Sequence, residues 1–149
     1  RQERLGPARA RNRGAREATG ELLLFLGDDT VPEPGLLARH DSAHREPQDR
    51  PLAVLGRTEW DRQRMSVTPL LDYMNEYGLQ FGFALISNPD DVPFNFFFTS
   101  NVSLPREVFL GLGGFDETFP SAAWQDIELA YRATRAWPPL RPTAHKSLA

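Results

Sequence analysis

Cysteine is absent from this chain, lysine occurs once, and long apolar runs are missing. Without cysteine, neither disulfides nor zinc–thiolate sites can form. No stretch approaches the roughly 20 apolar residues that a transmembrane helix needs, and no pattern typical of a secretory signal is visible. We therefore expect no transmembrane segment and a cytoplasmic location, with peripheral association with the inner membrane as the alternative.

The remaining composition is that of an ordinary globular chain, with 40% hydrophobic and 25% charged residues. A length of 149 residues suits one domain, so we expect residues 1–149 to form a single domain. The chain begins without methionine and ends without an obvious capping element. We therefore expect it to be a piece of a longer protein.

A cluster of arginines opens the chain, and it raises the question of nucleic-acid or anionic-membrane binding. The formal net charge is nevertheless -3, and acids dominate the rest of the sequence. No aromatic residues are interleaved with the arginines, as they are in many single-strand binders. We therefore expect no nucleic-acid partner. The six arginines are Arg1, Arg4, Arg9, Arg11, Arg13 and Arg16.

Alternating apolar runs and amphipathic stretches predict an α/β fold. The run LLLFL at Leu22–Leu26 predicts a central parallel strand that is buried on both faces. Further strands are expected within 52–60, within 95–104 and weakly in the tail. Helices are expected from Pro7 to Ala18, within 35–46, from Pro69 to Tyr77 after an N-cap at Thr68, from Pro105, and within 122–137 after an N-cap at Ser121.

Asp28 and Asp29 follow the LLLFL run, at the strand end where α/β sheets usually bind ligands. Mg²⁺ and Mn²⁺ accept one or two carboxylates and fill their other positions with water and phosphate oxygens. Successive side chains point to opposite sides of an extended segment, so we expect only one of the two to hold a metal. The competing interpretation is an ordinary turn, because Gly and Asp are frequent in turns.

Asp126 lies at the start of a predicted helix, where a base that takes a hydroxyl proton could be held rigidly. The alternative is that Asp126 only complements the positive end of the helix dipole. Glu128 is expected to be a solvated helix residue or the partner of Arg132, four positions on, and not a catalyst. Trp124 could stack on a sugar ring or pack in the core.

Three further polar features of the sequence are candidates for ligand contacts. Asn101 follows Thr99 and Ser100 near a run of three phenylalanines, and these side chains could contact a sugar. His145 could be a metal ligand, because neutral imidazole binds Mn²⁺ well. His40 and His44 are four apart on a predicted helix, but no third ligand is suggested nearby. We expect them to be surface residues.

The order of five sequence blocks resembles the inverting glycosyltransferases of family 2, which have the GT-A fold. The blocks are ARNRGAREATGE, LLLFLGDDTVPEP, TSNVSLPREVF, GGFDETF and WQDIELAYR. The resemblance implies a mixed, Rossmann-like sheet flanked by helices and truncated at the N-terminus, without the family's nucleoside-binding βαβ portion. It implies a UDP- or GDP-sugar donor, a carbohydrate or other hydroxyl acceptor, and a divalent cation, Mn²⁺ or Mg²⁺.

The resemblance also implies roles for individual residues. Asp126 matches the catalytic base, and Asp29 and His145 match metal ligands. Residues expected at the substrate are Asp28, Arg11, Asn12, Asn101, Trp124 and Gly114. The implied reaction is a single displacement with inversion at the anomeric carbon, and the isolated piece is expected to bind donor poorly.

Two departures from the family pattern support a competing hypothesis. Gly27 stands where many members have the first acid of the metal motif, and Gln125 stands where a Glu is usual. A non-catalytic, sugar-binding or structural relative would show such changes. The missing N-terminal portion would also expose a sheet edge, at which two copies could pair.

Overall fold

The computed structural model describes residues 6–46, 53–119, 123–136 and 143–144. Its elements form a mixed sheet with helices on both sides, which confirms the predicted α/β class. The strand order is β1-β3-β2-β4, and the strands are β1 (Leu22–Leu26), β2 (Val54–Leu55), β3 (Asn101–Pro105) and β4 (Thr143–Ala144). β3 runs antiparallel to both β1 and β2, whereas β4 runs parallel to β2.

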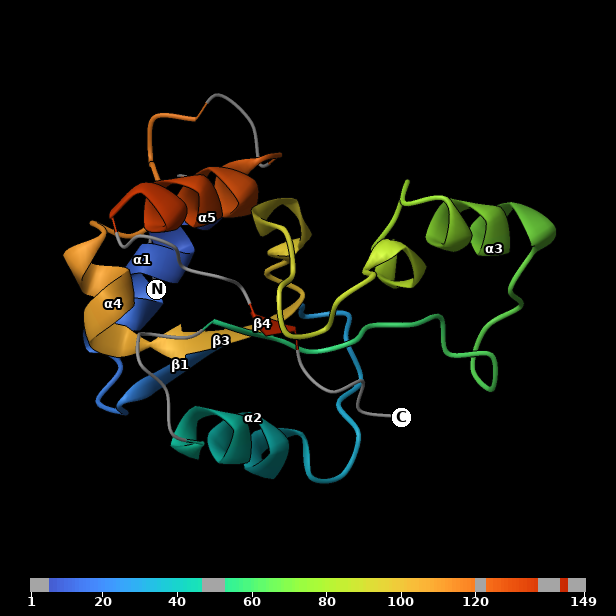
Figure 1. Ribbon diagram of the computed structural model, residues 1–149, viewed down its shortest axis with the longest axis horizontal. Helices are drawn as coiled ribbons and strands as arrows, with labels where there is room; N and C mark the ends of the chain where they lie inside the picture. The colour runs from blue at the N-terminus through green and yellow to red at the C-terminus, as the bar shows by residue number, and fades with distance from the viewer. Residues whose placement is uncertain (1–5, 47–52, 120–122, 137–142, 145–149) are drawn as a thin grey trace.

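The helices cover the two faces of the sheet unequally (Figure 1). On one side lie α1 (Pro7–Glu17), α4 (Arg106–Gly111) and α5 (Gln125–Ala136), and on the other lies α2 (Leu36–Arg45). The main core forms between α1, α4, α5 and the sheet, with Phe109 and Leu129 fully buried. α3 (Pro69–Glu76) lies away from the sheet, beside the 3-10 helix η1 (Phe83–Leu85).

β1 differs from its prediction. It is an edge strand of the described sheet and pairs antiparallel with β3, and only Leu23 of its five residues is buried. An unbroken apolar run indicates a strand, but it does not encode the direction of the neighbouring strand. Within the described sheet, the outer edge of β1 has no partner strand, as expected. The pairing of two copies there stays a prediction.

The weakly predicted strand in the tail is present as β4, and the other two predicted strands are shorter than expected. Within 52–60, only Val54–Leu55 forms a strand. Within 95–104, the strand begins at Asn101, because Phe94–Phe96 forms a 3-10 turn after Pro93. The aromatic run divides between two clusters, since Phe97 joins the main core and Phe96 packs with Leu55 and Val92.

Helix predictions agree better with the structure. α3 begins after Thr68, whose Oγ1 accepts a hydrogen bond from Leu71 N at 3.4 Å, so that N-cap is confirmed. α1 buries Ala8, Asn12 and Ala15 as its spacing predicts. On α2, Leu36 is buried but Leu37 is exposed. The predicted cap Ser121 lies outside the described residues.

The prediction that His40 and His44 are surface residues is wrong for His40, which is 3% exposed. Its ring nitrogens lie 2.8 Å from Ser103 Oγ and 3.0 Å from Asn101 Oδ1, and His44 Nε2 lies 2.8 Å from the same hydroxyl. β3 turns Asn101 and Ser103 toward α2 because residues two apart share a strand face. The histidines therefore form a polar layer between α2 and the sheet.

Candidate active site

The loop that carries Asp28 and Asp29 follows β1 directly, and both aspartates are exposed. Gly27 N donates a hydrogen bond to Ser100 O at 3.0 Å, which joins this loop to the residues before β3. An added Cβ at Gly27 would lie 2.8 Å from Asp29 Oδ1. The Asp29 side chain is therefore folded back over Gly27.

Asp126 reaches the same point in the fold from α5. Its Oδ2 accepts a hydrogen bond from Thr99 N at 3.5 Å, and its Oδ1 accepts one from Ile127 N at 3.0 Å. The carboxylate is half-buried in the first turn of α5, where the helix dipole favours negative charge. Since Thr99 and Ser100 are adjacent, the loop after β1 and the start of α5 are both attached to one dipeptide.

Trp124 precedes α5 and has a φ of 71°, a left-handed conformation that bulky residues rarely adopt. Its carbonyl accepts the Glu128 N–H at 2.9 Å, while its side chain is 67% exposed. The core alternative for Trp124 is therefore wrong. An exposed aromatic ring in a strained backbone is more typical of a binding site than of packing.

Glu128 forms an ion pair with Arg132, as the i,i+4 spacing predicts. Arg132 Nε lies 2.5 Å from Glu128 Oε1, and Arg132 Nη2 donates to Gly114 O at 2.6 Å. This arginine therefore joins α5 to the loop after α4, and its pairing leaves Asp126 as the better candidate for a base.

Three residues that the resemblance assigned to substrate form a second group on α1 and the loop after α4. Asn12 Oδ1 accepts a hydrogen bond from Phe115 N, and its Nδ2 donates to Phe115 O, both at 2.8 Å. The Arg11 guanidinium lies 5.6 Å from the centre of the Phe115 ring. Gly114 has a φ of 73°, and an added Cβ would lie 2.5 Å from Asn12 Oδ1. These contacts hold the loop in place.

Asn101 is 4% exposed, and its amide is engaged on both sides. Nδ2 donates to Arg57 O at 3.3 Å, and Oδ1 faces His40. The side chain passes so close to Gly56 that an added Cβ there would lie 2.2 Å from Asn101 Nδ2. Sequence reasoning missed His40 and Gly56; a glycine directly after a strand was the available signal for the latter.

Within the described ranges, no three His, Asp or Glu side chains gather into a group that could hold a metal. His145 lies outside these ranges. Two neighbouring exposed carboxylates still fit a hard cation that completes its coordination with water and diphosphate oxygens.

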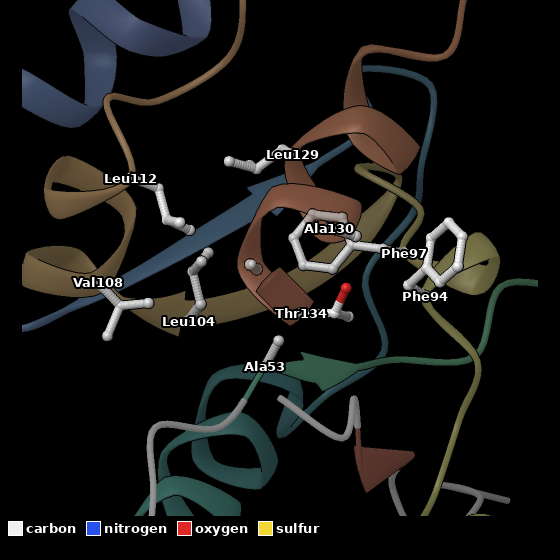
Figure 2. Close-up of a pocket in the computed structure, with 10 residues that line it drawn as sticks. Ala53, Phe94, Phe97, Leu104, Val108, Leu112, Leu129, Ala130 and Thr134 are labelled. Carbon is white, nitrogen blue, oxygen red and sulfur yellow. The ribbon is translucent and has the colours of Figure 1, made fainter. Parts of the chain in front are cut away.

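Among the described residues, a cavity lies on each side of the sheet. One lies between α5, α4 and the sheet and is lined by apolar side chains together with Thr134 (Figure 2). It contains neither Asp29 nor Asp126 and has no group that could do acid–base chemistry. The other, on the α2 side, is polar and adjoins the loop after Asp29.

The chain belongs to glycosyl transferase family 2, because the model of that family, described as "Glycosyl transferase family 2", matches residues 1–104 of the 149. The α/β architecture is compatible with part of the GT-A fold. The match covers the loop after β1 and Asn101 but ends before α5. Asp126 therefore lies beyond it.

Two curated relatives are similar to nearly the whole chain. Both are named Validoxylamine A glucosyltransferase, from Streptomyces hygroscopicus subsp. jinggangensis (strain 5008) and subsp. limoneus. Each is 31% identical over 88% of this chain. The chain spans only 36% and 34% of their lengths.

No helix within the described parts of the chain has the length and apolar character needed to cross a bilayer.

Proposed function

We propose that this chain supplies the metal-binding and catalytic-base part of an inverting glycosyltransferase. The donor is a nucleotide sugar, UDP- or GDP-linked, and the acceptor is a hydroxyl group of a carbohydrate or similar molecule. The names of the two relatives favour glucose as the sugar. One observation carries the proposal: the Asp28–Asp29 loop and Asp126 are both attached to Thr99–Ser100, although they are far apart in the sequence.

In the proposed reaction, Asp126 accepts the proton of the acceptor hydroxyl. The hydroxyl oxygen forms a bond to the anomeric carbon as the bond to the diphosphate oxygen breaks, and the electron pair leaves with the nucleoside diphosphate. Two backbone N–H groups fix the Asp126 carboxylate, which keeps its position with little reorganisation. A single displacement inverts the anomeric configuration.

Asp29 is the proposed metal ligand, with His145 as a second and Asp28 toward the sugar or ribose. Asp29 and His145 would hold a divalent cation, Mn²⁺ or Mg²⁺, which would supply Lewis-acid stabilisation of charge on the diphosphate. The exposed Trp124 ring is proposed to stack on the acceptor sugar beside Asp126.

The base is tested by Asp126→Asn in the natural full-length product, with UDP-glucose and GDP-glucose as donors. We expect transfer to fall about 10²- to 10⁴-fold, the usual contribution of general base catalysis, while donor affinity stays unchanged. Asp41→Asn is the matched control, because Asp41 is a surface acid on α2 that only pairs with Arg45. An Asp126→Asn variant with full activity contradicts the role as base.

The metal role is tested by calorimetric titration of UDP and GDP with and without Mn²⁺. We expect Mn²⁺ to strengthen nucleotide binding, and Asp29→Asn to remove that increment. Binding that does not depend on metal, or that is identical in Asp29→Asn, contradicts the assignment. A protein that binds sugars but shows no transfer with any donor would favour the non-catalytic alternative.

A further inference from the structure

α2 is attached to the sheet by one short row of side chains. It covers its side of the sheet without help from α1, α4 or α5 (Figure 1), and its buried residues are Leu36 and His40. His44 follows one turn later and is half-buried, so the three side chains lie on one face of the helix. Leu36 is the only apolar member of this row. The attachment of α2 therefore depends on the polar contacts of the two histidines.

The hydrogen atoms of these contacts follow from counting donors and acceptors. Asn101 Nδ2 donates to Arg57 O, so Asn101 Oδ1 is the acceptor for His40 Nε2, which carries a hydrogen. A neutral imidazole has only one N–H, so His40 Nδ1 accepts the hydrogen of Ser103 Oγ at 2.8 Å. That hydroxyl has no second hydrogen, so His44 Nε2 must donate to Ser103 Oγ, also at 2.8 Å. We call His40, Ser103 and His44 the His–Ser–His network.

This network can accept one proton without losing any of these hydrogen bonds. His44 can take the proton on its other ring nitrogen, since its Nε2 already donates. His40 can take it on Nδ1 only if the Ser103 hydroxyl turns to donate to a neutral His44. When both rings are charged, both donate to Ser103 Oγ, and the serine hydrogen has no acceptor within the network. Two positive charges then lie beside one buried hydroxyl, so a second proton opposes the attachment of α2.

The position of the two rings favours His44 for the first proton. His44 lies in the last turn of α2, where the helix dipole favours positive charge, whereas His40 is 3% exposed. β3 adds no charge here, because Asn101 and Ser103 are neutral. The charged groups on and around α2 are the pairs Glu33–Arg39, Asp41–Arg45 and Arg57–Glu59, with Glu21 before β1 and Glu46 at the end of α2. Each of these arginines has a carboxylate beside it.

We propose that the His–Ser–His network is an acid-sensitive attachment of α2 to the sheet, which tolerates one added proton and opens at the second. The direction of the pH effect follows from the protons that each state binds. With α2 detached, both histidines take up protons near the ordinary value of about pH 6.5, whereas the attached helix keeps one of them neutral. The detached state therefore binds one more proton below about pH 6.5, and the ratio of detached to attached α2 rises about tenfold for each pH unit. The attachment is fully present above that pH.

α2 follows the loop that carries Asp28 and Asp29, so its detachment would release the far end of that loop. An effect of acid on metal or nucleotide binding rests on the proposed function; the detachment of α2 does not.

The first experiment determines where the protons are, in the natural full-length product labelled with ¹⁵N and free of metal and nucleotide. Long-range ¹H–¹⁵N correlations distinguish the two neutral forms of histidine from the cation, and His40→Gln and His44→Gln assign the signals. At about pH 8 we expect both rings in the Nε2–H form, and His44 should become a cation first, with His40 still neutral below about pH 6.5. His40 in the Nδ1–H form, or equal titration of the two rings, would overturn the proposal.

The second experiment measures detachment by amide hydrogen exchange at about pH 7.5 and about pH 5.5, with rates corrected for the intrinsic effect of pH. Protection of α2 should fall about tenfold, while that of β1 and β3 stays constant. His40→Gln keeps one donor and one acceptor but does not titrate, so protection of α2 should no longer depend on pH. A pH dependence that persists in His40→Gln, or equal loss of protection in β1 and β3, would contradict a local attachment.

Ser103→Ala tests the network even if His40→Gln folds poorly, because it removes only one small buried hydroxyl. It breaks two hydrogen bonds and should lower the protection of α2 about tenfold already at neutral pH. Ser42→Ala is the matched control, because Ser42 is exposed on the same helix, and it should leave the pH dependence intact. Equal protection of α2 in Ser103→Ala and Ser42→Ala would refute the proposal. None of these measurements involves glycosyl transfer, so this proposal and the proposed function fail separately.

Discussion

Asn12 is predicted to be essential for the stability of the loop after α4. Its side chain is 3% exposed and makes three hydrogen bonds: two with the backbone of Phe115 and one, at 2.9 Å, to Glu117 Oε1. Asn12→Ala would leave the N–H and C=O of a buried residue without partners. Each unpaired buried group costs about 1–3 kcal/mol, so we expect the free energy of unfolding to fall by about 2–6 kcal/mol.

The control is Arg9→Ala, which removes a different contact of α1 with the same loop. Arg9 Nε lies 3.2 Å from Glu117 Oε2, and both side chains are partly exposed. Exposed ion pairs contribute about 0–1 kcal/mol, so this variant should change stability little. The two variants therefore separate the buried amide from the surface charge.

The assay is urea unfolding followed by far-UV circular dichroism, with donor affinity measured in parallel. A loss of less than 1 kcal/mol in Asn12→Ala, or a loss equal to that of Arg9→Ala, would refute the reasoning. The resemblance implied that Asn12 contacts substrate. If that role dominates, nucleotide-sugar affinity falls while the free energy of unfolding is unchanged.

Two further predictions concern the same loop. Gly114→Ala should lower the melting temperature more than Gly113→Ala. Both glycines have positive φ, but an added Cβ meets the Asn12 side chain only at Gly114. Equal melting temperatures of the two variants would contradict this prediction. Hydrogen bonds from Thr118 N and Oγ1 lower the pKa of Asp116 below its ordinary value. The associated stability is present above the unfolded pKa of about 3.9 and is lost as pH falls through the lowered folded value. Thr118→Val should raise the Asp116 pKa toward normal in an NMR titration, and an unchanged pKa would exclude the hydroxyl as a cause.

Local signals in the sequence were sufficient to predict the helices. Thr68 followed by Pro69 marks a helix start by cap chemistry alone, and α3 begins there. The i,i+4 pair Glu128–Arg132 also follows from helical spacing. Interactions of this kind are set by residues within one turn of each other, so no knowledge of the tertiary fold is needed.

The direction of β1 and the burial of His40 could not be read in the same way. Both depend on β3, which lies about 75 residues after β1 in the sequence and runs antiparallel to it. Taken alone, histidines four apart on a helix suggest side chains that face solvent. The burial of His40 follows only from the position of Asn101 and Ser103 opposite α2. Two polar residues on one face of a strand were the only available sign of a polar layer there.

Gly27 is one of the two departures from the family pattern, and its surroundings bear on how that departure is interpreted. A decayed metal motif would lose an acid and leave its position empty. Here the space beside Gly27 is filled, since an added Cβ would lie 2.8 Å from Asp29 Oδ1 and 2.7 Å from Thr30 Oγ1. An acidic side chain at position 27 would require the ends of the Asp29 and Thr30 side chains to turn aside, so the present position of Asp29 depends on the glycine. The glycine therefore does not by itself favour the non-catalytic alternative, and the choice between the two hypotheses rests on Asp29 and Asp126.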